Sequence, residues 1–252
     1  MKLLRFSLLL ALLLAVTMPA QADDPAPAPS PAEVAKVQKI IADYLKAHPE
    51  IIIDALQAYQ KKQDAAKAEA ARQSIIAARA ELLNDATNPV GGNPKGDVTI
   101  VEFFDYSCPY CRAVDPDLQK AISADGNVRV IYKEFPILGP ESLVASRAAL
   151  AAAGQGKYQA FHDKLLSYKG SLNDATIYSI ASDAGLDVTK LKADMEKPEI
   201  KNQIDRNYHL ADKLNIQGTP AFIIGDIMLP GAASFDDLTA AFKQARSSSK
   251  GG

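Results

Sequence analysis

Two cysteines separated by two residues are the part of this sequence with the clearest capacity for chemistry. Cys108 and Cys111 enclose Pro109 and Tyr110, and the 252 residues contain no other cysteine. A pair at this spacing can form a structural disulfide, hold a metal ion or exchange disulfides with other molecules. Each role requires different surroundings, so the neighbouring sequence decides between them.

A structural disulfide and a zinc site both fit poorly. A disulfide that closes four residues adds only about 2 kcal/mol by chain entropy, which a chain able to bury a large core does not need. A closed zinc site takes four ligands, whereas the three histidines, His48, His162 and His209, are scattered and no second cysteine pair exists. We therefore predict no resident metal and no cofactor. Two thiolates could still hold Cu(I), because soft ligands suit this ion.

The surrounding sequence predicts a strand that ends just before the pair and a helix that begins at it. Residues 98–106 form a long apolar run, the helical pattern starts at Pro109, and residues 128–133 form a second strand. This order predicts a parallel βαβ unit with a right-handed crossover. Cys108 would then lie at a helix N-terminus, where free N–H groups and the helix dipole favour a thiolate. We predict that Cys108 attacks and that Cys111, one turn inward, resolves the mixed disulfide.

The other elements of this half follow from periodicity and turn residues. Residues 88–97 are dense in Gly, Pro and Asn, and they predict a boundary loop. Residues 140–214 predict several short helices. Two short strands, 221–224 and 227–229, predict a hairpin, and residues 235–245 predict a closing amphipathic helix.

The first 31 residues predict export and a tether. Lys2 and Arg5 precede an apolar run that is too short to span a bilayer comfortably, and Ala20-Gln21-Ala22 offers small residues at a cleavage site. Residues 1–22 are therefore predicted to be a cleaved signal peptide that directs the protein to the periplasm; the competing interpretation is a membrane anchor. Residues 23–31 alternate Pro with small residues and predict an extended tether.

Residues 32–86 predict a helical N-terminal module. Ser30 can cap its first helix with Glu33 three residues later. Apolar residues follow at helical spacing, first from Val34 to Tyr44 and again from Ile52 to Tyr59. Such stripes either pack on the body of the same chain or meet copies of themselves. Both possibilities stay open at this stage.

Two motifs resemble a known family. Residues 98–112 (Val-Thr-Ile-Val-Glu-Phe-Phe-Asp-Tyr-Ser-Cys-Pro-Tyr-Cys-Arg) resemble the active-site segment of the DsbA-like periplasmic disulfide oxidoreductases. Residues 217–222 (Gln-Gly-Thr-Pro-Ala-Phe) resemble the cis-proline loop of the thioredoxin superfamily. The resemblance covers about residues 88–246. It implies an α/β, thioredoxin-like catalytic domain over residues 87–252, with a helical insertion at about 138–214.

The resemblance also implies roles for individual residues. Cys108 would be the nucleophile and Cys111 the resolving thiol. Thr219 would offer its backbone to an extended substrate, and Pro220 would be cis. Glu102 would be the buried acid that moves protons for the inner cysteine. A partly exposed strand end is the competing account of this carboxylate.

Pro109 and Tyr110 are expected to contact substrate, and they mark a departure from one branch of the family. Strong oxidases of the family often carry His between the cysteines. The Pro-Tyr pair removes a cation near the thiolate, which argues against a strongly oxidising potential. This pair is seen in the oligomeric, isomerase-like branches of the family.

The N-terminal extension is similar to that of the Com1-like and ScsC-like (suppressor of copper sensitivity) members, in which the extension makes oligomers. The resemblance thus implies a homo-oligomeric disulfide isomerase or reductase, a trimer rather than a dimer. It would act on misoxidised exported proteins and be kept reduced by a DsbD- or ScsB-like membrane partner. The alternatives are a monomeric oxidase served by a DsbB-like partner, a periplasmic Cu(I) carrier and a client-binding chaperone. The net charge of -2 gives no reason to expect nucleic acid as a partner.

Overall fold

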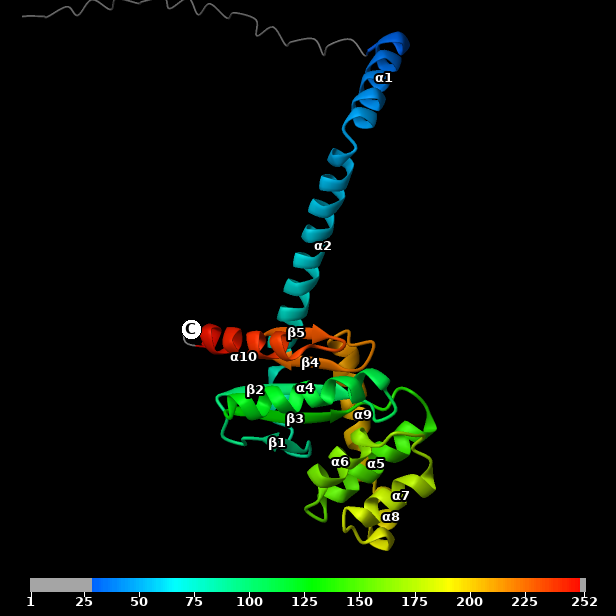
Figure 1. The fold of residues 1–252 in the computed structure, drawn as a ribbon, viewed down its shortest axis with the longest axis vertical. Coiled ribbons are helices and arrows are strands. Elements are labelled where there is room, and N and C mark those ends of the chain that lie inside the picture. Colours follow the sequence, from blue (N-terminus) through cyan, green and yellow to red (C-terminus); the bar gives the residue numbers. More distant parts are fainter. Residues whose placement is uncertain (1–28, 250–252) are drawn as a thin grey trace, which may run out of the picture. The chain divides into compact units, whose positions relative to one another are not determined.

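The computed structural model describes residues 29–249, so the predicted signal peptide lies outside the described residues, as does most of the tether. The chain divides into two compact units between Ala58 and Tyr59. This division comes earlier than the predicted boundary at residue 86, because residues near the end of the second helix are buried in the second unit. Figure 1 shows the fold as a ribbon coloured along the sequence from blue to red. None of the described helices is long and apolar enough to cross a membrane.

The first unit holds helix α1 (Pro31–Ala47) and the first turns of α2 (Glu50–Ala77). The predicted capping box is present: the Glu33 backbone N–H donates to the Ser30 hydroxyl, and the Glu33 carboxylate accepts from the Ser30 backbone at 2.8 Å. No side chain of α1 is buried. Large apolar side chains that are 37–62% exposed follow one another along both helices: Val34, Val37, Ile40, Ile41, Tyr44, Ile51, Ile52, Ile53 and Leu56.

A five-stranded sheet in the order β1-β3-β2-β4-β5 forms the centre of the second unit. Strand β2 (Val98–Phe104) pairs in parallel with β3 (Val128–Glu134), as the predicted βαβ unit requires. On its other side β2 pairs antiparallel with β4 (Ala221–Ile224), which forms the predicted hairpin with β5 (Ile227–Pro230). The crossover between β2 and β3 is helix α4 (Pro109–Asp125).

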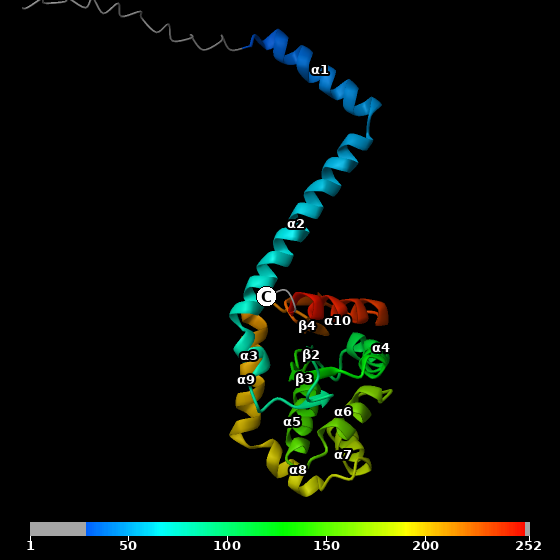
Figure 2. The same cartoon turned by 90° about the vertical axis from the view of Figure 1, so that its left-hand side faces the viewer.

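Both faces of the sheet are covered, and strand alternation assigns each side chain to one face. Val101 and Phe103 lie in a cluster with residues from the end of α2, from α3 (Arg79–Leu83) and from α9 (Pro198–Lys213). Ile100 and Phe104 face the larger core under α4 and α10 (Phe235–Ser249). Figure 2 shows α3 and α9 on one side of β2 and β3, with α4 and α6 on the other.

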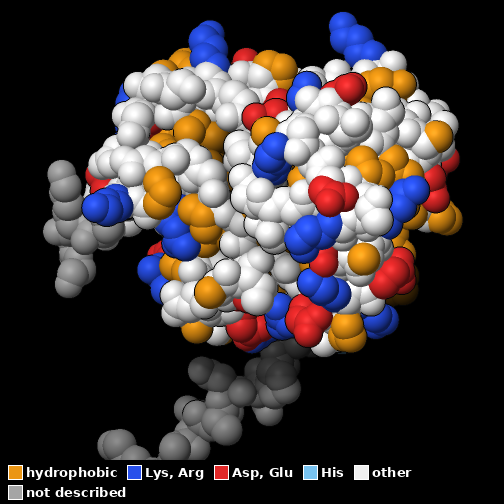
Figure 3. All heavy atoms as spheres, turned by 90° about the horizontal axis from the view of Figure 1, so that it is seen from below, with side chains coloured by type: hydrophobic (Ala, Val, Ile, Leu, Met, Phe, Trp, Pro, Cys, Tyr) orange, Lys and Arg blue, Asp and Glu red, His pale blue; other side chains and the backbone are white. Residues whose placement is uncertain are grey.

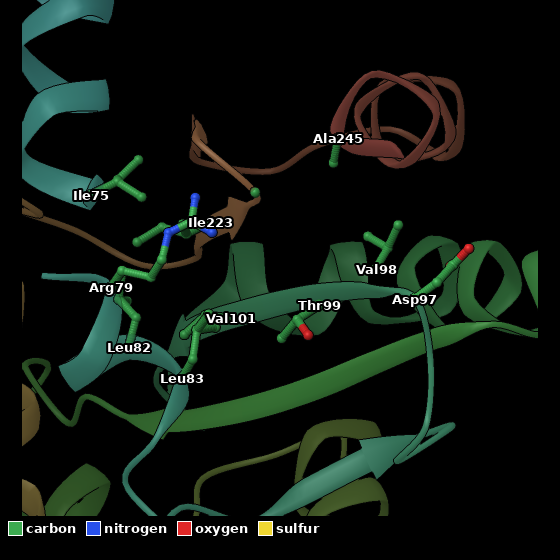
Figure 4. A pocket seen from close by; sticks show the side chains of 11 residues that line it. Ile75, Arg79, Leu82, Leu83, Asp97, Val98, Thr99, Val101, Ile223 and Ala245 are labelled. Atoms are coloured by element: carbon green, nitrogen blue, oxygen red, sulfur yellow. The ribbon is translucent and has the colours of Figure 1, made fainter. Parts of the chain in front are cut away.

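The junction between α2 and α3 belongs to this core. Ile75, Ala78 and Leu82 are each at most 2% exposed, although residues 61–81 contain few large apolar side chains. Figure 4 shows Ile75, Arg79 and Leu82 facing the sheet at a cavity of about 220 Å³. Arg79 also contacts Asp226 in the β4–β5 turn at 2.5 Å. The alanine-rich end of α2 and the start of α3 therefore pack on the sheet through a few buried apolar side chains and one ion pair.

Five helices between β3 and β4 form the predicted insertion. They are α5 (Pro140–Ala153), α6 (Tyr158–Ser167), α7 (Asp174–Asp183), α8 (Val188–Met195) and α9. Asn173 and Asp187 cap α7 and α8 through their side-chain oxygens. Lys, Arg, Asp and Glu side chains are interspersed over the face formed by this insertion in Figure 3, without a patch of one sign on that face.

Strand β1 (Val90–Gly92) differs from the sequence prediction, which assigned residues 88–97 to a loop. It pairs antiparallel with β3 at the edge of the sheet. A Cβ at Gly91 would lie 2.8 Å from the Tyr132 side chain, and a Cβ at Gly92 would lie 2.4 Å from the backbone carbonyl oxygen of Val128, so glycine at these positions lets the strand approach β3 closely. The glycines that predicted a turn instead allow a close strand contact.

Candidate active site

The two cysteines lie at the start of α4, where the sequence predicted them. Cys108 is the N-cap residue, with Pro109 at the first helical position. Its backbone N–H donates to the Asp105 carbonyl at 3.0 Å, and its own carbonyl accepts from Arg112 at 3.2 Å. Both cysteines are free thiols, 3% and 1% exposed. Only one turn of helix separates them, so a disulfide between them needs no large movement of the chain.

The predicted cis-proline loop, residues 217–222, contacts the cysteine motif. The Cys108 thiol donates to the carbonyl oxygen of Thr219 at 3.2 Å, and the Thr219–Pro220 peptide bond is cis, as the resemblance implied. The Pro220 carbonyl accepts from Gly231 at 2.8 Å, which ties this loop to the end of β5. A cavity of about 280 Å³ is lined by residues 215–221 before and at the start of β4, and by Met228, Pro230 and Gly231 at the end of β5. Thr219, whose carbonyl accepts from Cys108, is one of the residues that line this cavity.

Tyr110 and Pro109 lie on the open side of the site. The Tyr110 side chain is 65% exposed, and Pro109 is exposed as well. Thr219 is half-buried and Pro220 is buried. Cys108 therefore lies between two exposed residues that follow it in the chain and the half-buried Thr219, whose carbonyl accepts from its thiol.

Glu102 lies inside the sheet, on the face that packs against α4. It is 2% exposed, which excludes the partly exposed strand end that competed with a functional role. Burial, with Asp115 and Glu134 nearby, raises the pKa of Glu102 to about 8. Its Oε2 atom has no hydrogen-bond partner among the described residues. Burial, then the charges of Glu102 and Cys108, also raise the pKa of Cys111 well above its usual range.

The raised pKa values of Glu102 and Cys111 bear on how the two cysteines exchange a disulfide. The thiolate is the attacking species, so Cys111 cannot resolve a mixed disulfide until a base removes its proton. Glu102 is the buried carboxyl group whose charge acts on Cys111. A pKa of about 8 keeps Glu102 in the range where it can both take and return a proton near neutral pH.

Two further residues shape the active-site turn and were not singled out from the sequence. Asp105 accepts from the Ser107 backbone at 2.7 Å and from the Leu138 backbone at 3.0 Å. Arg112 donates through Nε to the Tyr106 carbonyl at 2.7 Å and through Nη1 to the Gly170 carbonyl at 3.2 Å. Both therefore tie the turn before Cys108 to loops of the helical insertion. Their place in the motif, three residues before Cys108 and one after Cys111, was the available signal.

A buried hydrogen-bond network lies behind the same turn. The Glu134 carboxylate accepts from Tyr106 at 3.0 Å, Tyr158 at 2.9 Å and Ser146 at 2.7 Å. His162 Nδ1 lies 3.0 Å from the Tyr106 hydroxyl. Because Tyr106 donates its one proton to Glu134, we assign the His162 proton to Nδ1. The network connects β3, α5 and α6 to the residue two before the nucleophile.

The described residues contain no group of three or more His, Cys, Asp or Glu side chains that could hold a metal ion.

Two parts of the chain each match the model of a known protein family. Residues 99–243 match the model of the DSBA-like thioredoxin domain, and residues 33–66 match that of the copper resistance protein ScsC N-terminal domain. A thioredoxin-like oxidoreductase from Silicibacter pomeroyi is 48% identical with a TM-score of 0.66, over 67% of this chain and 98% of that one. ScsC of Proteus mirabilis in a transitional conformation is 33% identical with a TM-score of 0.66, over 87% of this chain and 99% of that one.

Curated relatives give the same family with lower identity. Disulfide bond formation protein D of Bacillus subtilis is 27% identical over 162 residues, which is 60% of this chain and 73% of that protein. The chain also matches Na(+)/H(+) antiporters from Salinispora, but it spans only about a quarter of their length. The family match covers more than half of the chain and contains both motifs around the thiols. The chain therefore belongs to the DSBA-like thioredoxin domain family, and its dithiol site is that of a thiol–disulfide oxidoreductase.

Proposed function

We propose that this protein is an exported, homo-oligomeric disulfide isomerase or reductase that acts on misoxidised proteins in the periplasm. Cys108 attacks a disulfide of the client and forms a mixed disulfide. Cys111 then releases the client in reduced form, with Glu102 as the acceptor of its proton. Pro109, Tyr110, Thr219 and Pro220 contact the client chain. A membrane reductant of the DsbD or ScsB type returns the pair to the dithiol state.

The exposed apolar surface of α1 and the start of α2 carries the oligomer proposal. Val37, Ile41 and Leu56 are 52–62% exposed, and α1 buries no side chain at all. Removing apolar surface from water contributes about 25 cal/mol per Å², so helices with such stripes gain stability by meeting copies of themselves. The match of residues 33–66 to an ScsC N-terminal domain supports the same proposal. Oligomerisation would place several active sites around one client.

Substitution of the stripe tests this proposal. In the variant Val37→Glu, Ile41→Glu two charges enter the stripe. The matched control Ala35→Glu, Ala42→Glu adds the same two charges to exposed positions elsewhere on α1. We expect the native protein to form a stable oligomer by light scattering and to reactivate a client with scrambled disulfides. The stripe variant should be monomeric and lose that reactivation, while the control keeps both. A native protein that is monomeric at every concentration would overturn the oligomer and favour the dithiol oxidase.

Copper(I) transport is the second candidate, favoured by the copper resistance protein whose N-terminal domain the chain matches. The same two thiols would hold the ion as a two-coordinate site. A Cu(I) titration against a competing chelator tests it. An affinity far above that of an unrelated CxxC protein, lost in Cys108→Ser, would support the carrier. An ordinary dithiol affinity would exclude it.

A further inference from the structure

A cavity of about 510 Å³ lies on the face of the sheet that α3 and α9 cover (Figure 2). Its walls come from α3, from the turn that follows α3 and from α9, and Lys133 of β3 also lines it. Neither cysteine is among the described residues that line this cavity, and Thr219 is not among them either. The proposed disulfide exchange therefore makes no use of it.

Lys133 is a buried cation in this cavity. It is 1% exposed, and its register neighbour Phe103 packs in the cluster under α3 and α9. The Lys133 Nζ atom donates to the Glu81 carbonyl oxygen at 3.1 Å, which is its one hydrogen bond among the described residues. An ammonium group has three hydrogens to donate. Burial of a charge costs free energy unless an opposite charge compensates it.

The neighbouring charges do not compensate Lys133, because they are paired elsewhere. The Arg206 guanidinium donates to Asp85 Oδ2 at 3.2 Å. Glu81 Oε1 accepts from the Lys213 ammonium at 2.5 Å. Within the described part of the chain, Lys133 forms no ion pair at all. The cavity therefore holds one buried positive charge that lacks a partner.

Asn207 adds a second polar group without a partner. It is 1% exposed and lines the same cavity. Its Nδ2 atom donates to the Glu134 carbonyl oxygen at 3.0 Å, which fixes the orientation of the amide. Its Oδ1 atom has no hydrogen-bond partner among the residues that the structure describes. A buried acceptor without a donor is costly, so this oxygen calls for a donor from a bound molecule.

We propose that this cavity binds a small monocarboxylate with a hydroxyl group beside its carboxylate, that is, a 2-hydroxy acid. The carboxylate accepts from the Lys133 ammonium and supplies the missing negative charge. The hydroxyl donates to Asn207 Oδ1. Asp85 and Glu81 line the same cavity and disfavour dianions, because a second negative charge would meet them. Leu210 offers an apolar contact to the carbon atoms of the ligand.

The protonation of Lys133 links this binding to pH. Burial lowers the pKa of Lys133 to about 8. The charge of Arg206 lowers this pKa further, whereas the charges of Asp85 and Glu81 raise it. His209, which is exposed, is the remaining titratable group among the described lining residues. Because a carboxylate prefers the charged amine, binding at pH 8 should take up to about half a proton per site.

Calorimetric titration with lactate, propionate and inorganic phosphate tests the proposal. Lactate and propionate share one carbon skeleton and differ in the hydroxyl group. At pH 7 the native protein should bind lactate roughly 3- to 10-fold more tightly than propionate, and it should not bind phosphate measurably. Lys133→Met removes the charge and keeps a long side chain. Its affinity for lactate should fall by at least about 10-fold, and it should take up no proton at pH 8.

Lys201→Met is the matched control. It makes the same substitution on α9, where Lys201 pairs with Asp205 at 2.5 Å and neither residue lines the cavity. This variant should bind lactate with native affinity, which separates a site at Lys133 from a general attraction of anions. Lactate should raise the Tm of the native protein and of Lys201→Met but not that of Lys133→Met. The same thermal scans show that each variant is folded.

The possible outcomes distinguish this site from the thiol site. Native affinity for lactate in Lys133→Met would overturn the proposal, as would the absence of binding to the native protein at up to about 10 mM. Equal affinities for lactate and propionate would overturn the role of Asn207 Oδ1 and with it the hydroxy acid. Cys108→Ser should bind lactate as the native protein does, so failure of the proposed disulfide exchange would leave this inference intact.

Discussion

The thiol of Cys108 donates a hydrogen bond to the carbonyl oxygen of Thr219 at 3.2 Å. This contact joins the start of α4 to the loop before β4, two segments that are 111 residues apart in the sequence. It places the nucleophile against the backbone that a client chain is proposed to follow.

Substitution of each cysteine should separate the two steps of exchange. A serine at position 108 can donate to the same carbonyl, so Cys108→Ser should unfold within about 0.5 kcal/mol of the native protein in urea. It should nevertheless form no mixed disulfide, because a hydroxyl is far less nucleophilic than a thiolate. Cys111→Ser should instead accumulate the mixed disulfide with glutathione, visible as added mass. Exchange at the native rate in Cys108→Ser would contradict the redox assignment.

Glu102 should make the protein less stable as the pH rises. Its pKa is raised to about 8 in the folded state, against about 4.5 when unfolded, so the folded state binds the extra proton between these values. The free energy of unfolding should therefore fall between pH of about 4.5 and 8, at up to about 1.4 kcal/mol per pH unit from this group.

Glu102→Gln should remove that slope. Native protein and variant should be similar at low pH, and the variant should become the more stable one up to pH 8. Urea unfolding at four pH values measures this, with the exposed Glu199→Gln as control. Parallel curves for the native protein and Glu102→Gln would show that Glu102 does not carry a raised pKa.

His162 should have the opposite effect on the acid side. Burial lowers the pKa of His162 to about 3, so below about pH 6.5 the unfolded chain takes up a proton that the folded protein refuses. The stability linked to His162 is present above pH 6.5 and is lost as the pH falls toward 3. In His162→Gln, the free energy of unfolding should fall less steeply between pH 6 and 4. An unchanged acid slope would contradict the buried, neutral imidazole.

Gly96 should tolerate no side chain. A Cβ at this position would lie 2.5 Å from the Asn127 carbonyl oxygen and 2.7 Å from the Arg129 nitrogen, both of them backbone atoms that cannot rotate away. Gly96→Ala should therefore destabilise the protein by about 1–3 kcal/mol in urea. Gly218→Ala is the control, because a Cβ there meets nothing within 4 Å. Equal stability of the two variants would show that the chain near Gly96 can move aside.

The sequence predicted the fold best where local signals and long-range contacts agree. Strands β2 and β3 are apolar runs of the right length, and the helix between them begins at Pro109 with a cysteine at its N-cap. The meeting of Cys108 and Thr219 could be predicted only from the resemblance, because nothing local indicates which segments of a chain lie together.

Three features of the structure were not predicted from the sequence, because each depends on contacts between residues that are distant in the chain. Residues 90–92 are rich in glycine, which usually predicts a turn, yet here glycine permits close contact with Tyr132. The core position of Ile75 lies within an alanine-rich helix that offers little apolar pattern. The Glu134 network draws on residues from β3, α5 and α6 that are separated in sequence, so no spacing reveals it.

The order of strands also bears on how the chain is made. Strand β2 occupies the middle of the sheet, but its second neighbour, β4, begins only at Ala221. During synthesis β2 can pair with β3 early, while its other edge stays unpaired until β4 has been made. An unpaired edge next to two thiols invites pairing with other chains. We therefore expect a nascent chain to need protection until the C-terminal hairpin closes the sheet.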